Sequence, residues 1–98
     1  MVIVWGSVIA AEGRLDELLE ISLEHVRRSR REPGCIAHGA YVDTERGSRV
    51  VFFEKWESEA ALRRHFAVPE SGEFVRRAAA LAEGAPEIEI YRGESVPL

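Results

Sequence analysis

The residues best suited to acid–base chemistry in this chain are polar side chains that interrupt apolar segments. Glu54 stands between Phe52 and Trp56 in a run rich in valine and aromatics. A carboxylate in such surroundings must find a partner or line a polar cavity. If that cavity lies under helices, Glu54 acts as a general base or orients a neighbouring histidine. Pairing with an arginine such as Arg92 is also compatible with the pattern.

The chain has three histidines, whose unperturbed pKa of about 6.5 suits them to proton transfer near neutral pH. His65, near the end of a short predicted helix, is the candidate proton acceptor, although the helix macrodipole alone also favours a histidine there. His38 has the small neighbours Ala37 and Gly39, so it can line a cavity or lie at an interface. His25, at the edge of an apolar stripe, is more typical of a border residue than of a catalyst.

Metal, cofactor and thiol chemistry find little support in the spacing of these residues. No His-x-x-x-His or His-Glu-x-x-His pair occurs, and there is no Gly-x-Ser-x-Gly elbow, Walker A loop or dinucleotide-binding glycine motif. Cys35 is the single cysteine, so it forms neither an internal disulfide nor a Cys-x-x-Cys motif. We therefore expect no metal and no cofactor.

The composition is that of one globular domain, residues 1–98, with 46% hydrophobic residues and a formal net charge of −4. The acidic balance removes the general attraction to phosphate backbones on which nucleic-acid binding largely depends. The longest uncharged apolar run, residues 2–11, is far shorter than the ~20 residues of a membrane span, and no basic segment precedes it. We expect a soluble, cytoplasmic protein with neither nucleic acid nor membrane as a partner.

The elements that must position these residues alternate between strands and helices. β-Branched and aromatic runs predict strands over residues 2–9, 35–44, 49–57 and 87–93. Apolar stripes predict amphipathic helices over residues 14–31, 59–66 and 71–82, with Ser58 and Ser71 as N-caps of the second and third. The order β-α-β-β-α-β, with the second helical element split, predicts an α+β ferredoxin-like sandwich with a four-stranded antiparallel sheet.

Two of the predicted strands carry apolar side chains on both faces, for example Val4 beside Trp5 and Phe52 beside Phe53. The helices of so short a chain cover one face only, which leaves an apolar patch of the kind that marks an interaction site. Each large apolar side chain withdrawn from water contributes on the order of 1.5 to 3 kcal/mol. We therefore expect the second face to pack on the same face of an identical subunit, giving a homodimer with a barrel-like core.

Two blocks of sequence resemble the antibiotic biosynthesis monooxygenase family. They are Glu32-Pro33-Gly34-Cys35 at the start of the second strand, and residues 53–62 leading to His65, with Pro69 and Phe74 beyond. The resemblance covers essentially the whole chain. It implies a dimeric ferredoxin-like α/β barrel with a pocket between sheet and helices in each subunit. The best-known members oxidise quinols or polycyclic phenols with molecular oxygen and without metal, flavin or haem.

The resemblance also implies roles for individual residues. His65 would accept a proton from the substrate or hydrogen-bond it, and Glu54 would orient a neighbour. Trp56 and Phe53 would lie beside the bound ring, and we place His38 and Tyr41 in the same substrate pocket. Once a base has removed its proton, a phenol or hydroquinone is electron-rich enough to give an electron to oxygen.

The sequence leaves three functions open. The first is a cofactor-independent monooxygenase that oxidises a quinol-like or polycyclic phenolic small molecule with molecular oxygen. A cofactor-free isomerase of a small oxo compound would use the same pocket for acid–base chemistry alone. A non-catalytic dimeric binding or stress protein would use His38, Glu54 and His65 only structurally. Haem degradation is not expected, because the asparagine, tryptophan and histidine of that branch are missing near Gly6, His65 and Ala78.

Overall fold

The computed structural model describes residues 1–98 and contains the predicted alternation of strands and helices. Its elements in chain order are β1 (Val2–Ile9), α1 (Leu15–Ser29), β2 (Cys35–Val42), β3 (Arg49–Trp56), α2 (Glu59–Ala67), α3 (Pro69–Leu81) and β4 (Glu87–Arg92). The strands form one antiparallel sheet in the order β2-β3-β1-β4. The predicted α+β ferredoxin-like architecture is therefore confirmed.

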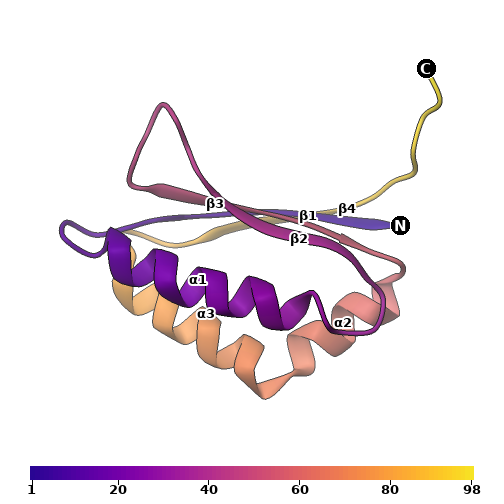
Figure 1. Ribbon diagram of the computed structural model, residues 1–98, viewed down its shortest axis with the longest axis horizontal. Helices are drawn as coiled ribbons and strands as arrows, with labels where there is room; N and C mark the ends of the chain where they lie inside the picture. Colours follow the sequence, from indigo (N-terminus) through magenta and orange to yellow (C-terminus); the bar gives the residue numbers. More distant parts are fainter.

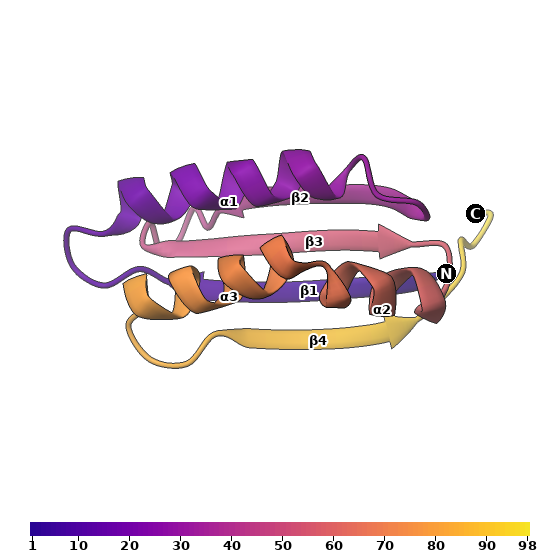
Figure 2. The ribbon, with the colours of Figure 1, turned by 90° about the horizontal axis from the view of Figure 1, so that it is seen from below.

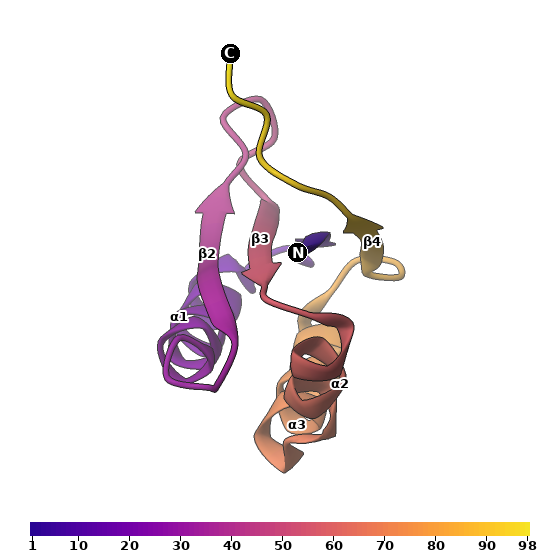
Figure 3. The same cartoon turned by 90° about the vertical axis from the view of Figure 1, so that its right-hand side faces the viewer.

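All three helices cover the same face of the sheet (Figure 1). Seen from the helix side, α1 runs along β2, whereas α3 and α2 follow one another over the side of the sheet that holds β1 and β4 (Figure 2). The connection between β2 and β3 and the C-terminal residues extend away from the helices (Figure 3). None of the helices is long and apolar enough to cross a membrane.

Helix α1 follows from its apolar stripe and from the charges at its ends. Leu18, Ile21 and Val26 are buried, while acidic residues occupy the first turn and arginines the last, as the macrodipole favours. After the helix, Gly34 adopts a φ of +84°, and a Cβ at this position would lie 2.6 Å from the Cβ of Ala61 in α2. Only glycine therefore lets the chain turn into β2 so close to α2.

The two short helices meet at a proline. Ser58 caps α2 as predicted, since its hydroxyl accepts a hydrogen bond of 3.1 Å from the backbone N–H of Ala61. The predicted start of α3 at Ser71 is wrong, because the helix begins at Pro69. A proline at the first helical position needs no N–H partner and has a suitable φ. The Ser71 hydroxyl instead accepts a hydrogen bond of 3.2 Å from Arg28 of α1.

The alternation along β1 and β3 divides the sheet into a covered and an uncovered face. Val4, Val50 and Trp56 are fully buried beneath the helices. Trp5, which is 48% exposed, and its cross-strand partner Phe53 point the other way. No segment of the chain covers this second face, which agrees with the prediction that one chain buries only half of the apolar sheet.

Candidate functional site

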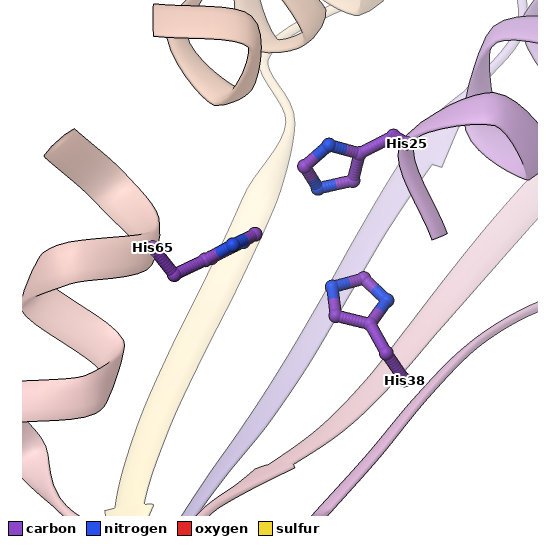
Figure 4. A group of neighbouring side chains, drawn as sticks. All are labelled: His25, His38 and His65. Carbon is purple, nitrogen blue, oxygen red and sulfur yellow. The ribbon is translucent and has the colours of Figure 1, made fainter. Parts of the chain in front are cut away.

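All three histidines of the chain come together between the sheet and the helices. His25 comes from α1, His38 from β2 and His65 from α2, and their rings face one another (Figure 4). One ring nitrogen from each lies within 4.8 Å of those of the other two, and all three side chains are buried. Three elements that are distant in the sequence therefore build one polar cluster in an apolar core.

The register of β2 against β3 brings His38 to this cluster. His38 lies directly opposite Glu54, and its Nε2 is 3.2 Å from the Glu54 Oε1. The register shifts between Cys35 and Ala37. Because side chains alternate along a strand, a shift of one residue decides which face the following residues occupy. This irregularity therefore places the His38 side chain on the face of the sheet that the helices cover.

Glu54 lies beneath the helices, which agrees with the interpretation that it lines a polar cavity there. Its Oε1 accepts a hydrogen bond of 2.9 Å from the Trp56 Nε1 and lies 3.9 Å from the His65 Nε2. Pairing with Arg92 does not occur, because that guanidinium donates hydrogen bonds of 2.8 and 3.1 Å to Glu59 at the surface. Glu54 is thus a member of the histidine cluster.

The carboxyl of Glu54 is held in its charged form. Burial alone would raise its pKa. Contacts with His38 and Trp56, together with the nearby His65, outweigh burial and bring the pKa of Glu54 below its usual value. The cluster therefore contains a buried negative charge beside three imidazoles.

His65 and Glu32 form a carboxylate–histidine pair. The His65 Nδ1 lies 2.9 Å from the Glu32 Oε1, and the other Glu32 oxygen accepts a hydrogen bond of 2.9 Å from Arg28. Since a charged carboxylate only accepts hydrogen bonds, the proton of the neutral ring is on Nδ1 and the Nε2 lone pair is free. Burial lowers the pKa of His65, and the two carboxylates Glu32 and Glu54 only partly offset this. The ring is therefore a neutral proton acceptor near pH 7.

His25 has the opposite tautomer. Arg28 lies with its Nη2 2.8 Å from the His25 Nδ1, and because a guanidinium only donates, the Nε2 of the neutral ring carries the proton. Burial, followed by the charges of His38, His65 and Arg28, lowers the pKa of His25 to about 3. His25 thus presents an N–H donor, and Phe74 stacks on its ring at a centroid distance of 4.1 Å.

A cavity of about 170 Å³ connects the cluster to solvent. It is bounded by β1, β3 and β4 on one side and by α2 and α3 on the other, and its lining includes His25, Glu54 and His65. Phe52 and the exposed side chains of Val75 and Ile88 supply apolar surface. Since a protein cavity of ~150 Å³ accommodates benzene, this one holds a single aromatic ring, and a larger molecule would project past its mouth.

The structure does not bring all predicted pocket residues to this cavity. Phe53 and Tyr41 lie on the uncovered face, where they line a separate hollow of about 450 Å³ over β2 to which His38 also contributes. Strand alternation explains the difference, because odd and even positions of β3 face opposite ways. Trp56 is fully buried behind His65 at a ring-centroid distance of 4.6 Å, and neither Trp56 nor His38 lines the cavity. These two residues contact Glu54 from the core and do not face the cavity.

Three members of the site were missed by sequence reasoning. Glu32 and Arg28 form an i, i+4 pair at the end of α1, a spacing that could have indicated their mutual contact. The contact of Arg28 with His25 lies within one turn of α1, whereas the contact of Glu32 with His65 depends on how the turn after α1 packs on α2. His25 itself was interpreted as a border residue, but it is buried at the centre of the cluster.

The fold and the cluster define a ferredoxin-like α+β protein with a buried acid–base site next to an apolar cavity. The sequence model of the antibiotic biosynthesis monooxygenase family matches residues 1–77. The chain belongs to this family.

Similar proteins agree with this assignment. An uncharacterised protein of Synechocystis is 34% identical over 91 residues, which are 93% of this chain but 62% of that protein. A crystal structure of an antibiotic biosynthesis monooxygenase is 27% identical, with a TM-score of 0.88 and coverage of 99% of this chain and 100% of that one. A structure from Mycobacterium tuberculosis is 19% identical, with a TM-score of 0.90 and coverage of 97% and 96%, and shows the same fold.

Proposed function

We propose that this chain oxidises a quinol-like or phenolic small molecule with molecular oxygen and without a cofactor. The observation that carries the proposal is the pair formed by Glu32 and His65, which leaves an unprotonated Nε2 beside an apolar cavity. Membership of the antibiotic biosynthesis monooxygenase family supports a monooxygenase-like activity. The cavity volume favours a substrate that inserts one aromatic ring.

The reaction begins with proton transfer. The phenolic O–H gives its proton to the His65 Nε2, and Glu32 stabilises the resulting imidazolium through the Nδ1–H. The phenolate then gives an electron to oxygen held beside it in the cavity. The His25 N–H, fixed by Arg28, is available to donate to the oxyanion that develops.

No external reductant is needed for this oxidation. One atom of oxygen is added at a ring carbon, and the substrate loses the hydrogen of that carbon together with its phenolic hydrogen, which gives a quinone. The other oxygen atom leaves as water with these two hydrogens. The substrate supplies all the electrons, and His65 returns its proton to the departing oxygen. This balance is consistent with a site built only from side chains.

The test is oxygen consumption by the purified protein with a panel of anthrones, hydroquinones and naphthols. We expect uptake that His65→Gln reduces by on the order of 10²- to 10⁴-fold, while Cys35→Ser, outside this cavity, leaves it unchanged. Absence of uptake across the panel would overturn the proposal. Turnover that persists without oxygen would favour the isomerase instead.

We also propose that two chains form a homodimer through the uncovered face of the sheet. Trp5 and Tyr91 are 48% and 52% exposed on this face, next to Phe53. Aromatic side chains at this density are typical of a contact surface, and a second copy of the same face offers matching apolar area.

A further inference from the structure

His38 is a buried imidazole without a hydrogen-bond partner. Its side chain is completely inaccessible, and neither ring nitrogen makes a hydrogen bond. The contact of 3.2 Å between its Nε2 and the Glu54 Oε1 is not aligned as one. Buried polar groups are nearly always satisfied, so an unpaired one marks a place where a ligand or ion can complete the environment.

We propose that His38, His65 and Glu54 bind a divalent first-row transition-metal ion. The Glu54 Oε1 lies 3.2 Å from the His38 Nε2 and 3.9 Å from the His65 Nε2. Metal–ligand bonds of ~2.0 to 2.2 Å place ligand atoms roughly 3.0 to 3.5 Å apart around an ion. One ring nitrogen of His38 lies within 4.8 Å of one ring nitrogen of His65. Side-chain rotations that bring the two ligating nitrogens to the separation around an ion complete the site.

The donor atoms of His65 and Glu54 are in the protonation states that a metal ion requires. Binding at the His38 Nε2 moves that ring's proton to Nδ1, which has no partner of its own. Glu32 holds the proton of His65 on Nδ1, which leaves Nε2 as a lone pair, as in carboxylate–histidine–metal arrangements. Glu54 is oriented by the Trp56 N–H and contributes one negative charge. Two imidazoles and a carboxylate are donors suited to iron(II), zinc, nickel and copper.

His25 is not a ligand in this arrangement. Arg28 occupies its Nδ1 and leaves the proton on Nε2, so the ring donates a hydrogen bond instead of a lone pair. It is placed to donate to a water molecule or an anion bound at an open coordination position of the ion. That position is accessible through the cavity whose lining includes His25, Glu54 and His65.

Metal binding does not require the proposed oxidation to occur, but a bound ion would affect that reaction. The His65 Nε2 cannot accept a substrate proton while it ligates an ion. We therefore expect a bound metal to inhibit the cofactor-independent reaction. The two proposals can fail separately, because binding is measured without any substrate.

The experiment is calorimetric titration of untagged, chelator-treated protein with zinc chloride, supported by the absorption spectrum of the cobalt(II) form. We expect one ion per chain, with affinity reduced by more than about 100-fold in His38→Gln and Glu54→Gln. Cys35→Ser should bind as the native chain does, and His25→Gln should lose only about tenfold. Removing the purification tag is essential because the chain has only three histidines of its own.

Imidazole NMR signals provide a second measurement in the native chain, where no variant has to fold. Zinc should shift the ring signals of His38 and His65 at a stoichiometry of one. Absence of binding at millimolar zinc, or unchanged binding in both His38→Gln and Glu54→Gln, would overturn the site. Complete loss of binding in His25→Gln would contradict the role of His25 as a donor.

Discussion

At the scale of single residues, the three histidines of the cluster have the same side chain but different roles, because their hydrogen-bond partners differ. A carboxylate on Nδ1 makes His65 an acceptor, and a guanidinium on the same atom makes His25 a donor. His38 has no partner on Nδ1, and its Nε2 faces the Glu54 carboxylate. The identity of a histidine therefore says little about its role until its neighbours are known, which is why the sequence could not assign these three.

Replacement of Glu32 by glutamine tests the carboxylate–histidine pair. Glu32 raises the pKa of His65 against the effect of burial, so Glu32→Gln should lower that pKa further and weaken the base. We expect oxygen uptake to fall by on the order of 10²-fold and the NMR titration of His65 to move to lower pH. Glu20→Gln, an exposed substitution on α1, is the matched control. An unaltered His65 titration would refute the pairing.

The buried His25 should make the metal-free protein sensitive to acid. Its pKa is about 3 in the folded chain and near 6.5 when unfolded, so only the unfolded state binds the proton between these values. Stability is fully present above pH 6.5 and falls as the pH decreases toward 3, by up to about 1.4 kcal/mol per pH unit from this group.

Urea unfolding at pH 7 and pH 5 measures this dependence, with chelator present. His25→Gln has no such proton to bind and should show a weaker loss between the two pH values. His65, whose pKa is also lowered, contributes in the same direction and remains in the variant. An identical pH dependence in both proteins would exclude His25 as its source.

At the scale of elements, much of the structure could be predicted from the sequence. Alternation in β1 and β3 correctly put Val4 and Trp5 on opposite faces and Glu54 on the same face as Phe52 and Trp56. Alternation also separated Phe53 from Phe52 and Trp56, whereas the family resemblance placed Phe53 beside the substrate, and it lies on the uncovered face. The pair of Glu32 and His65, 33 residues apart, depends on how the turn after α1 packs on α2 and left no local signal.

Two glycines with similar backbone angles allow a test of how closely α2 packs on the turn before β2. Gly34→Ala adds a Cβ that would lie 2.6 Å from Ala61, whereas Gly13→Ala meets nothing within 4 Å. Both positions have positive φ, so both substitutions cost about 1 kcal/mol in backbone strain. We expect a loss larger by about 1 to 3 kcal/mol for Gly34→Ala. Urea unfolding measures the free energy of unfolding of both variants. Equal losses would show that the structure shifts to accommodate the added Cβ at position 34.

At the scale of the whole molecule, one chain leaves an aromatic sheet face uncovered. We expect Trp5→Glu to place a charge in the centre of the proposed dimer contact and to yield a single-chain mass by light scattering at micromolar concentration. Val75→Glu is the matched control, since Val75 is 60% exposed but lies on the helix side at the cavity mouth. A native protein with the mass of one chain would exclude the homodimer.

The two tryptophans lie on opposite faces of the same sheet and therefore offer two separate optical reporters. Trp56 is buried with its ring 4.6 Å from that of His65, whereas Trp5 is half-exposed on the uncovered face. A change in the charge of an imidazole alters the fluorescence of an indole packed against it. In a Trp5→Phe chain we thus expect the emission of Trp56 to follow the state of the site. In a Trp56→Phe chain we expect the emission of Trp5 to report the proposed association.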